Sequence, residues 1–415
     1  MTLSRPVQVD LDEQRALVTV RRMVRFDSRT ETEHESAVID WVLAEMADLG
    51  LEVHKQEVGP GRFNAVGVWR GGAGPSLMFN GHVDTNPVTE GWTVDPWGGV
   101  TDGTFVYGLG VSNMKAGCSS YLEAVRALKS TGFRPSGDVV LTFVVGELQG
   151  GIGTRRLIED GWAADFFVNC EPTDLTAMTE HAGAMEFVVE LTGDTRHLSK
   201  REEAVDALAA AADLAPAINA ITFPVPERAD GDGIDRAHVG VLRAGLGRDM
   251  LDTRPPQVAD VARLQGSARY GPEQDPRRVL RAMREVVDKV CARHPGIEAR
   301  LWSPDSLDAP SMAMPFSVDP ASPIVRIVNE AYRQVRGVEQ PTGAIRPYCY
   351  YGSDAALLQH GAGMRGIVCG PGGKYNTMPD ERVHIVDYLD AIRIHALTIA
   401  TMDELAASPG RPARG

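Results

Sequence analysis

The chain has 415 residues, 43% of them hydrophobic and 24% charged, and it carries a formal net charge of -14 at pH 7. This length exceeds what one ordinary hydrophobic core supports, so we expect two domains, and the composition is that of a soluble globular protein. The strong negative charge argues against nucleic acid and against an anionic membrane surface as partners.

The N-terminal segment contains no apolar core of the kind that signal peptides carry, and nowhere do about 18 apolar residues run together. We therefore expect a cytoplasmic protein that makes no contact with a membrane. Hydrophobic residues recur at helical spacing over residues 11–26 and 33–49, and Gly50 is expected to end the second helix.

Five strands are predicted in the first half of the chain, in the segments LEVHKQEV, FNAVGVWR, SLMFNGHVD, DVVLTFVVGE and ADFFVNCEP. The last three are so apolar that they should be central in a sheet. Helices predicted over residues 115–128 and 153–159 separate them. This alternation predicts an α/β domain with a mostly parallel sheet that helices cover on both faces.

The pattern changes after residue 179. Predicted strands in AMEFVVELTGD, HVGVLRAG and GSARYG surround an Ala-rich helix over residues 202–215, and a second helix follows over residues 276–294. A strand, helix, two strands, helix, strand arrangement predicts an inserted α+β, ferredoxin-like lid domain. A Pro/Asp/Gly-rich stretch lies between Phe223 and Asp235.

From about Gly296 we expect the α/β pattern to resume, with a strand in IEARLW and with helices over residues 322–336, 353–359 and 385–404. The predicted domains are a catalytic α/β domain of residues 1–179 and 294–405, a lid domain of residues 180–293, and a flexible tail of residues 406–415 that is rich in Pro, Gly and Arg.

The segment from Ser76 to Gly117 has features of a metal site. An apolar strand ends at His82, at the end of a strand where ligands gather in α/β sheets. Asp84, two residues on, points to the same side of an extended chain and can hold the tautomer of the imidazole. A Gly/Trp-rich loop then leads to GLGVSNMKAG, which contains Asn113, at the start of a helix.

The order of motifs GHVDTNP, Trp92, DPW, DG and GLGVSNMKAG resembles that of the co-catalytic zinc amidohydrolases, which include acetylornithine deacetylase, succinyl-diaminopimelate desuccinylase, carboxypeptidase G and aminoacylase. Their segment runs GHxDxVP, W, DPF, DG and GRGxxDMKGG. Later motifs agree as well: ELQGGIGT with the family's EExGGxGT, CEPT with EPT, and GSDA, GPG and PDE near the C-terminus. The resemblance implies a zinc-exopeptidase-like fold with an inserted lid domain that joins two subunits in a homodimer.

Position by position, the resemblance implies that His82 and Glu171 are metal ligands and that Glu147 is the general base. Three further ligand positions of the family are changed, because they hold Asn113, Leu148 and Thr377 in place of aspartate, glutamate and histidine. An amide oxygen supplies a dipole where the ion needs charge, and two good ligands rarely hold zinc tightly. We therefore expect one weak zinc site at most, or no metal.

Two candidates lie in the predicted lid. His197, in GDTRHLS, matches a family histidine that reaches into the partner's active site, so it joins Glu147 and Asp84 as a catalytic candidate. Arg269, in SARYGP, stands where the family has an arginine that binds the carboxylate of the substrate, a task that suits a forked guanidinium. Asn113 is a second substrate-binding candidate and can alternatively cap the helix that follows it.

Three functions remain open at this stage. The first is an amidohydrolase that cleaves an N-acyl or peptide bond of a small molecule with a carboxylate. The second is a repurposed, metal-independent enzyme of acyl transfer, condensation, elimination or cyclisation, and the third is a non-catalytic binding homologue. Changed metal positions among intact motifs favour an enzyme, in which burial beside Leu148 should raise the pKa of Glu147. The aromatic run Tyr348–Tyr351 either lines a pocket or packs the sheet.

Overall fold

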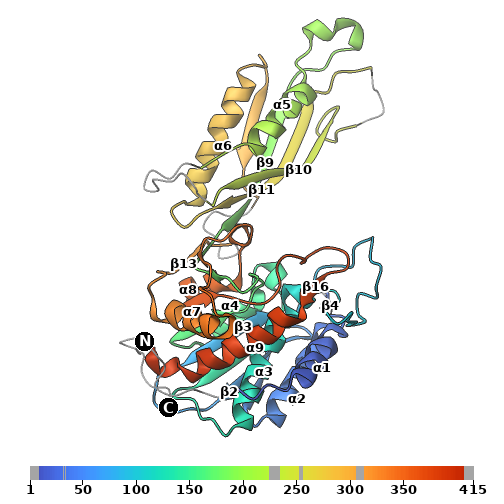
Figure 1. Ribbon diagram of the computed structural model, residues 1–415. Coiled ribbons are helices and arrows are strands. Elements are labelled where there is room, and N and C mark those ends of the chain that lie inside the picture. Colours follow the sequence, from blue (N-terminus) through green and yellow to red (C-terminus); the bar gives the residue numbers. More distant parts are fainter. Residues whose placement is uncertain are drawn as a thin grey trace. The chain divides into compact units, whose positions relative to one another are not determined.

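The computed structural model describes residues 9–30, 32, 34–223, 234–251, 256–304 and 313–405. The chain forms two compact units (Figure 1). Unit 1 consists of Met1–Thr179, Ser317–Tyr348 and Ser353–Gly415, and unit 2 consists of Glu180–Phe316 and Cys349–Gly352. Nearly all of the Pro/Asp/Gly-rich stretch after Phe223, and all of the tail over residues 406–415, lie outside the described residues.

Unit 1 is organised around an eight-stranded sheet with the strand order β1-β2-β5-β3-β6-β15-β7-β14. Its centre is parallel, since β3 (Leu77–His82) pairs with both β5 (Val139–Val144) and β6 (Phe166–Asn169). Every residue of these three strands is buried, as their apolar sequences predict. The fold class is therefore confirmed as α/β with a mostly parallel sheet.

The outer strands of this sheet differ in how well the sequence predicts them. β1 (Glu52–Gly59) and β2 (Arg62–Trp69) are the first two predicted strands, and the structure shows that they pair in antiparallel fashion. β15 (Arg365–Val368), which pairs in parallel with β6, was not predicted, because its four residues form a short run without a recognisable period. The shorter strands were also not predicted: β4 (Phe105–Tyr107), β7 (Ala177–Met178), β8 (Glu180–His181), β13 (Phe316–Ser317), β14 (Thr342–Gly343) and β16 (Arg382–His384).

Helices flank the sheet of unit 1, close to the predicted positions. They are α1 (Glu13–Val24), α2 (Glu35–Asp48), α3 (Ala116–Ser130), α4 (Ile152–Glu159), α7 (Pro323–Arg336), α8 (Asp354–Ala362) and α9 (Ile385–Ala400). Local signals set several ends. The side chain of Asp12 caps α1 by accepting from the backbone N–H of Arg15 at 2.9 Å, and Gly337 ends α7 in the left-handed conformation.

Unit 2 has the predicted order of a ferredoxin-like domain: β9 (Gly183–Thr192), α5 (Ala207–Asn219), β10 (Arg236–Gly245), β11 (Val261–Tyr270), α6 (Pro276–Cys291) and β12 (Glu298–Trp302). The strands form an antiparallel sheet in the order β10-β11-β9-β12. Alternate side chains of this sheet pack with α5 and α6 into a separate hydrophobic core.

The placement of the strand in IEARLW within the catalytic domain is wrong. This strand is β12, and it pairs with β9 in the sheet of unit 2. The alternating pattern of its side chains would suit either sheet, and the pairing that decides between them is a contact with residues more than 100 positions earlier in the chain.

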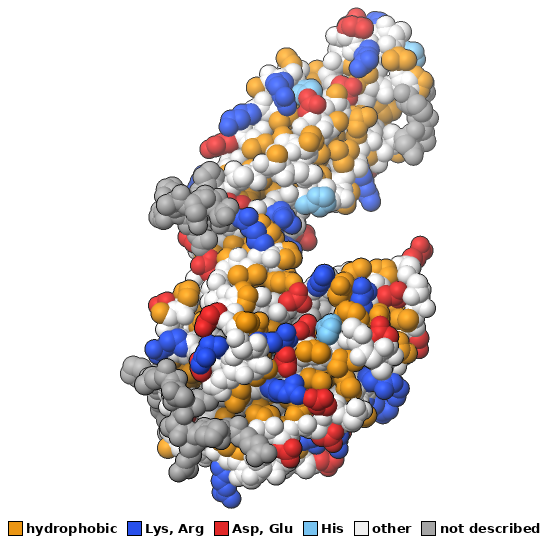
Figure 2. All heavy atoms as spheres, in the orientation of Figure 1, with side chains coloured by type: hydrophobic (Ala, Val, Ile, Leu, Met, Phe, Trp, Pro, Cys, Tyr) orange, Lys and Arg blue, Asp and Glu red, His pale blue; other side chains and the backbone are white. Residues whose placement is uncertain are grey.

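On the face that Figure 2 shows, acidic and basic side chains are interspersed. No described helix combines the length and the apolar character that crossing a membrane requires.

Candidate functional site

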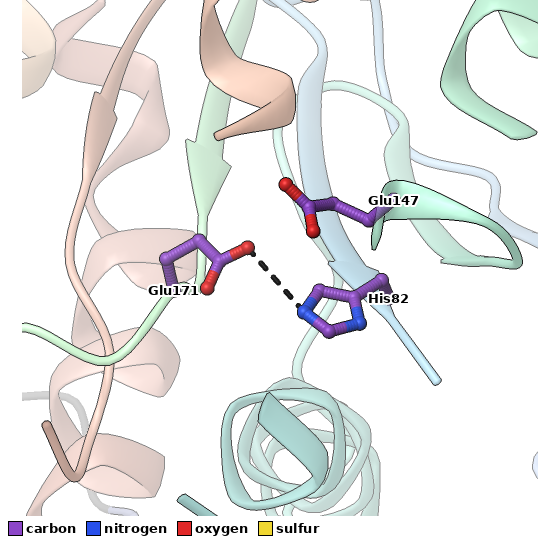
Figure 3. Close-up of side chains that lie close together, drawn as sticks. All are labelled: His82, Glu147 and Glu171. Atoms are coloured by element: carbon purple, nitrogen blue, oxygen red, sulfur yellow. Dashed lines mark ion pairs between the residues drawn. The ribbon is translucent and has the colours of Figure 1, made fainter. Parts of the chain in front are cut away.

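The ends of three neighbouring strands bring the main candidate residues together. His82 is the last residue of β3, Glu147 begins a 3-10 turn (Glu147–Gln149) shortly after β5, and Glu171 follows β6. The carboxyl ends of parallel strands meet at one edge of a sheet, which is where α/β folds place ligands. Figure 3 shows these side chains pointing toward a common space. We call His82, Glu147 and Glu171 the strand-end cluster.

His82 is buried, and its two ring nitrogens face different partners. Nδ1 lies 2.9 Å from the carbonyl oxygen of Asp84 and 3.3 Å from the carboxylate Oδ1 of the same residue. Nε2 lies 3.1 Å from Oδ1 of Asn113 and 3.5 Å from Oε1 of Glu171. Acceptors at Nδ1 hold a proton on that nitrogen, which leaves Nε2 directed into the cluster.

Asp84 is fully buried and serves the site from behind. Its two carboxylate oxygens accept from the backbone N–H groups of Glu147 and Leu148, each at 3.2 Å. Asp84 thus ties the turn that carries Glu147 to the ring of His82. This arrangement suits a residue that orients other groups rather than one that touches a substrate.

Burial shifts the pKa values of the cluster strongly. It raises the pKa of Glu171 to about 7 and that of Glu147 well above its usual range, although the nearby charge of His82 opposes both shifts. Burial alone would lower the pKa of His82, but the negative charges of Glu171 and Asp84 outweigh it and raise that pKa well above the ordinary value. The direction predicted for Glu147 is confirmed.

The strand-end cluster has the donor set of a metal site. One possible ligand atom from each of its residues lies within 4.8 Å of the others, and within the described ranges this is the one such group of three or more His, Cys, Asp or Glu. One imidazole and two carboxylates suit a divalent transition metal, and a carboxylate behind the imidazole is the usual support. Glu147 was predicted as a base and not as a ligand; its convergence with the other two depends on the turn after β5.

Asn113 lies at the edge of the cluster, and its predicted role as a helix cap is wrong. The N-cap of α3 is Lys115, with no capping bond from a side chain, whereas Oδ1 of Asn113 contacts His82. The loop that carries Asn113 is held by Glu381, a buried acid that accepts from the backbone N–H groups of Gly110, Ser112 and Asn113 at 2.9–3.0 Å. Sequence reasoning missed Glu381, although its place in the PDE motif was a usable signal.

A second acid that sequence reasoning missed is Asp354, at the start of α8 in the GSDA motif. It is buried and accepts from the hydroxyl of Thr154 at 2.7 Å, and its charge raises the pKa of both Glu147 and Glu171. Burial raises the pKa of Asp354 itself to about 6. Gly151, in the left-handed conformation, allows this close packing, because a Cβ there would lie 2.5 Å from Asp354.

The two other changed positions offer no metal ligand. Leu148 is half-buried directly after Glu147 and presents an apolar side chain. Thr377 is exposed in a turn before the PDE motif and has a positive φ of 55°. Neither position supplies the carboxylate or imidazole that the resembling family has there.

His197 and Arg269 both lie in unit 2, and their functional roles stay predictions. His197 is exposed and caps a short 3-10 helix by accepting from the backbone N–H of Ser199 at 3.2 Å. Arg269 lies on β11, where its Nη1 donates to the hydroxyl of Ser267 at 2.9 Å.

Similar proteins agree with this fold. The chain is 22% identical over 396 residues to N-formyl-4-amino-5-aminomethyl-2-methylpyrimidine deformylase of Halalkalibacterium halodurans, with 88% of each chain covered. It is 30% identical over 219 residues to carboxypeptidase G2 of Pseudomonas sp., and that match spans only about half of either protein (50% and 52%). Among solved structures, a tripeptidase of Staphylococcus aureus superposes with a TM-score of 0.74 and 22% identity, with 95% of this chain and 99% of the other covered.

A family model also matches this chain. The model of peptidase family M20/M25/M40 covers residues 78–401, which include all but the first residue of β3 and the whole strand-end cluster. That range is well over half of the chain and contains the motifs GHVD, ELQGG, EPT and PDE. The chain therefore belongs to peptidase family M20/M25/M40.

Proposed function

We propose that this protein is an amidohydrolase that cleaves an N-acyl or peptide bond of a small molecule with a carboxylate. The observation that carries the proposal is the convergence of His82, Glu147 and Glu171 at the ends of parallel strands, in a chain of the M20/M25/M40 family. An acid with a raised pKa beside a possible metal site is the equipment that hydrolysis of an amide needs.

We further propose that the site holds one divalent metal at most, and holds it weakly. His82 and Glu171 would be its ligands, and Glu147 could complete the set. A second metal lacks support, because the positions that would bind it are Asn113, Leu148 and Thr377. When bound, a divalent metal supplies polarisation of the carbonyl group and a lower pKa for a bound water.

Glu147 is the residue to which we assign proton transfer. It is half-buried, whereas His82 and Glu171 are buried, so it is the member of the cluster that a substrate reaches most readily. Burial raises the pKa of Glu147 well above its usual range, and a raised pKa makes a carboxylate a stronger base for taking a proton from water and delivering it to a leaving amine. Asp84 keeps Glu147 in place through the backbone of its turn.

The substrate contacts follow from the family resemblance. Asn113, beside His82, would donate or accept a hydrogen bond at the scissile amide. Arg269 would bind the carboxylate of the substrate. His197 would act in the site of a partner subunit, which requires a dimer.

A metal-independent enzyme of the same scaffold is the second candidate. It is favoured by the direct contact between Nε2 of His82 and the amide of Asn113, which gives His82 a hydrogen-bond partner where the family has a charged ligand. Acyl transfer, condensation, elimination or cyclisation on an activated substrate requires less help from a metal than hydrolysis of an inert amide. A protein that only binds such molecules is the remaining alternative.

Two measurements test the proposal together. The first is elemental analysis of protein purified in buffer with zinc or manganese, where we expect no more than one metal ion per chain. The second is release of free amine from a panel of N-acyl amino acids and dipeptides, with and without added metal. Two tightly bound metal ions per chain would contradict the proposed site. Activity that is the same with added metal and with a metal chelator would favour the metal-independent candidate.

We propose a homodimer that forms through unit 2, as the family resemblance implies. The strand AMEFVV and the Ala-rich helix need no partner, because β9 and α5 bury their apolar side chains within unit 2. Exposed apolar side chains of unit 2 include Leu198, Leu208 and Leu251, which are 61%, 47% and 55% exposed and line a hollow of about 320 Å³. β10 is an edge strand, and its open side can pair with a second copy.

A further inference from the structure

Two arginines lie directly opposite each other on the sheet of unit 2. Arg236 of β10 and Arg269 of β11 are register partners, and both lie on the face opposite to the buried side chains of Ala237 and Ala268. Figure 1 shows β10 and β11 side by side. The Cβ atoms of opposed residues are about 5 Å apart, and like charges at that spacing destabilise a sheet. We call Arg236 and Arg269 the arginine pair.

The surroundings of the arginine pair hold it in place without neutralising it. The guanidinium of Arg236 lies over the ring of Tyr350, 4.0 Å from its centroid, and Arg269 donates to the hydroxyl of Ser267. Among the residues that the structure describes, neither arginine forms an ion pair, although Glu186 lies on the same face opposite Ser267. Burial lowers the pKa of Arg269, as expected of a cation with incomplete compensation.

The same two strands contain a second opposed arginine pair that is neutralised. Arg243 and Arg263 are also register partners, but Nη2 of Arg263 lies 2.5 Å from the carboxylate of Glu190 on β9. The sheet therefore sets a carboxylate directly against one pair, whereas Arg269 has only the more distant charge of Glu186 and forms no ion pair with it. Within the part of the chain that the structure describes, no carboxylate pairs with Arg236 or Arg269, so both guanidinium groups remain able to bind an anionic ligand.

We propose that Arg236 and Arg269 bind the two carboxylates of one small molecule, an N-acylated acidic amino acid, while Tyr350 holds the guanidinium of Arg236. Each planar guanidinium matches one carboxylate with two parallel hydrogen bonds. A ligand with a single carboxylate would leave one cation of the pair uncompensated. This inference rests on the proposed function and narrows its substrate class from acyl amino acids in general to those with an acidic side chain.

Calorimetric titration of the full chain with N-acetyl-L-glutamate and N-acetyl-L-glutamine tests the inference, because these ligands differ by one charge and little in shape. We expect the wild type to bind the glutamate derivative about tenfold more tightly or better, as one charge-assisted pair provides. Arg236→Gln should remove that preference and leave the binding of N-acetyl-L-glutamine unchanged. Arg269→Lys, which keeps the charge at a half-buried position, should weaken the binding of both ligands.

Arg243→Gln is the matched control, since it removes an exposed arginine from the same strand and the same face. It should leave both affinities unchanged. Equal binding of the two ligands by the wild type, no detectable binding of either, or a preference that survives Arg236→Gln would overturn the inference. So would tighter binding of inorganic phosphate than of N-acetyl-L-glutamate.

The inference and the proposed function fail in different ways. If the protein hydrolyses acyl amino acids but binds N-acetyl-L-glutamate and N-acetyl-L-glutamine equally well, the proposed function stands and only the role of the arginine pair in specificity is wrong. Charge discrimination without any hydrolysis keeps the arginine pair and removes the amidohydrolase.

Discussion

The strand-end cluster of unit 1 and the surface of unit 2 around Arg236 differ in how their charged side chains are paired. In unit 1, His82, Asp84 and Glu171 are buried and compensate one another over distances of 3.3–3.5 Å. In unit 2, Arg236 is exposed and pairs with no carboxylate of the described residues, and leucines around a hollow are exposed as well. The strand-end cluster thus finds partners for its charges within the chain, whereas the described part of unit 2 leaves Arg236 and the exposed leucines able to contact other molecules. Substitutions in the strand-end cluster should therefore change the rate of the reaction, and substitutions on the surface of unit 2 should change the affinity for ligands or for a second subunit.

The largest effect is expected from Glu147→Gln. This change keeps the shape of the side chain and removes its ability to exchange a proton, so hydrolysis should fall by about 10²–10⁴-fold. The thermal stability of the protein should not fall, since burial disfavours the charged form of Glu147 and the backbone contact of Glu147 with Asp84 does not involve its carboxylate. Turnover per enzyme and the melting temperature are the measurements.

Glu159→Gln, on the exposed face of α4, is the control for this change and should retain wild-type turnover. A Glu147→Gln variant with near-native turnover would place the chemistry elsewhere. Metal affinity separates the two roles open to Glu147, because a base can be lost without weakening the binding of zinc, whereas a ligand cannot.

The second largest effect is expected from restoring the family's metal ligands at the three changed positions. The triple variant Asn113→Asp, Leu148→Glu, Thr377→His should bind zinc about 100-fold more tightly or better, because it supplies the charged ligands that the cluster lacks. Each single change should do little, since the ligands act as a set. Competition with a chromophoric chelator measures these affinities. A wild-type zinc affinity equal to that of the triple variant would show that Asn113, Leu148 and Thr377 do not weaken the binding of zinc.

Burial of acids in unit 1 predicts how stability depends on pH. Asp354 has an ordinary pKa of 3.8 and a folded pKa of about 6. As pH rises between these values, the unfolded chain releases the proton first, so the free energy of unfolding falls and stays lower above pH 6. Asp354→Asn removes this cost and should stabilise unit 1 at pH 8 by about 2–3 kcal/mol, with no gain near pH 4.

Urea unfolding in the presence of a chelator, followed by tryptophan fluorescence, checks this dependence. The signal reports mainly on unit 1, because Trp302 is the single tryptophan of unit 2. Asp48→Asn, at an exposed position near the end of α2, serves as the control and should leave the pH profile unchanged. A gain from Asp354→Asn that is the same at pH 4 and pH 8 would contradict the ionisation argument.

The regular elements and the place of His82 could be predicted from local patterns, because His82 ends an apolar strand and ligands gather at the ends of parallel strands. Glu147 and Glu171 lie shortly after β5 and β6, and their roles came from the resemblance to the zinc amidohydrolases.

The remaining features depend on contacts that no local pattern records. β12 was misplaced because its partner β9 lies more than 100 residues earlier. Asp354 and Glu381 were missed as parts of the site because their partners, Thr154 and the backbone of Asn113, lie 200 and 268 positions earlier in the chain. Asn113 fits the pattern of a helix cap equally well, and only the position of His82 decides that its oxygen is used there.

The smallest expected effect concerns the exposed apolar surface of unit 2. If Leu198 and Leu208 are covered by a second copy of the chain, light scattering at micromolar concentration should give about twice the monomer mass of 44.8 kDa. Leu208→Arg places a charge in the hollow and should weaken the dimer about tenfold or more, because a buried charge without a partner opposes association. Val338→Arg, at a 58% exposed valine of unit 1, should leave the mass unchanged. A wild-type protein that remains monomeric would show that these leucines do not form a dimer interface, and His197 could then not act in the site of a partner subunit. Any activity would then have to come from the strand-end cluster of a single chain.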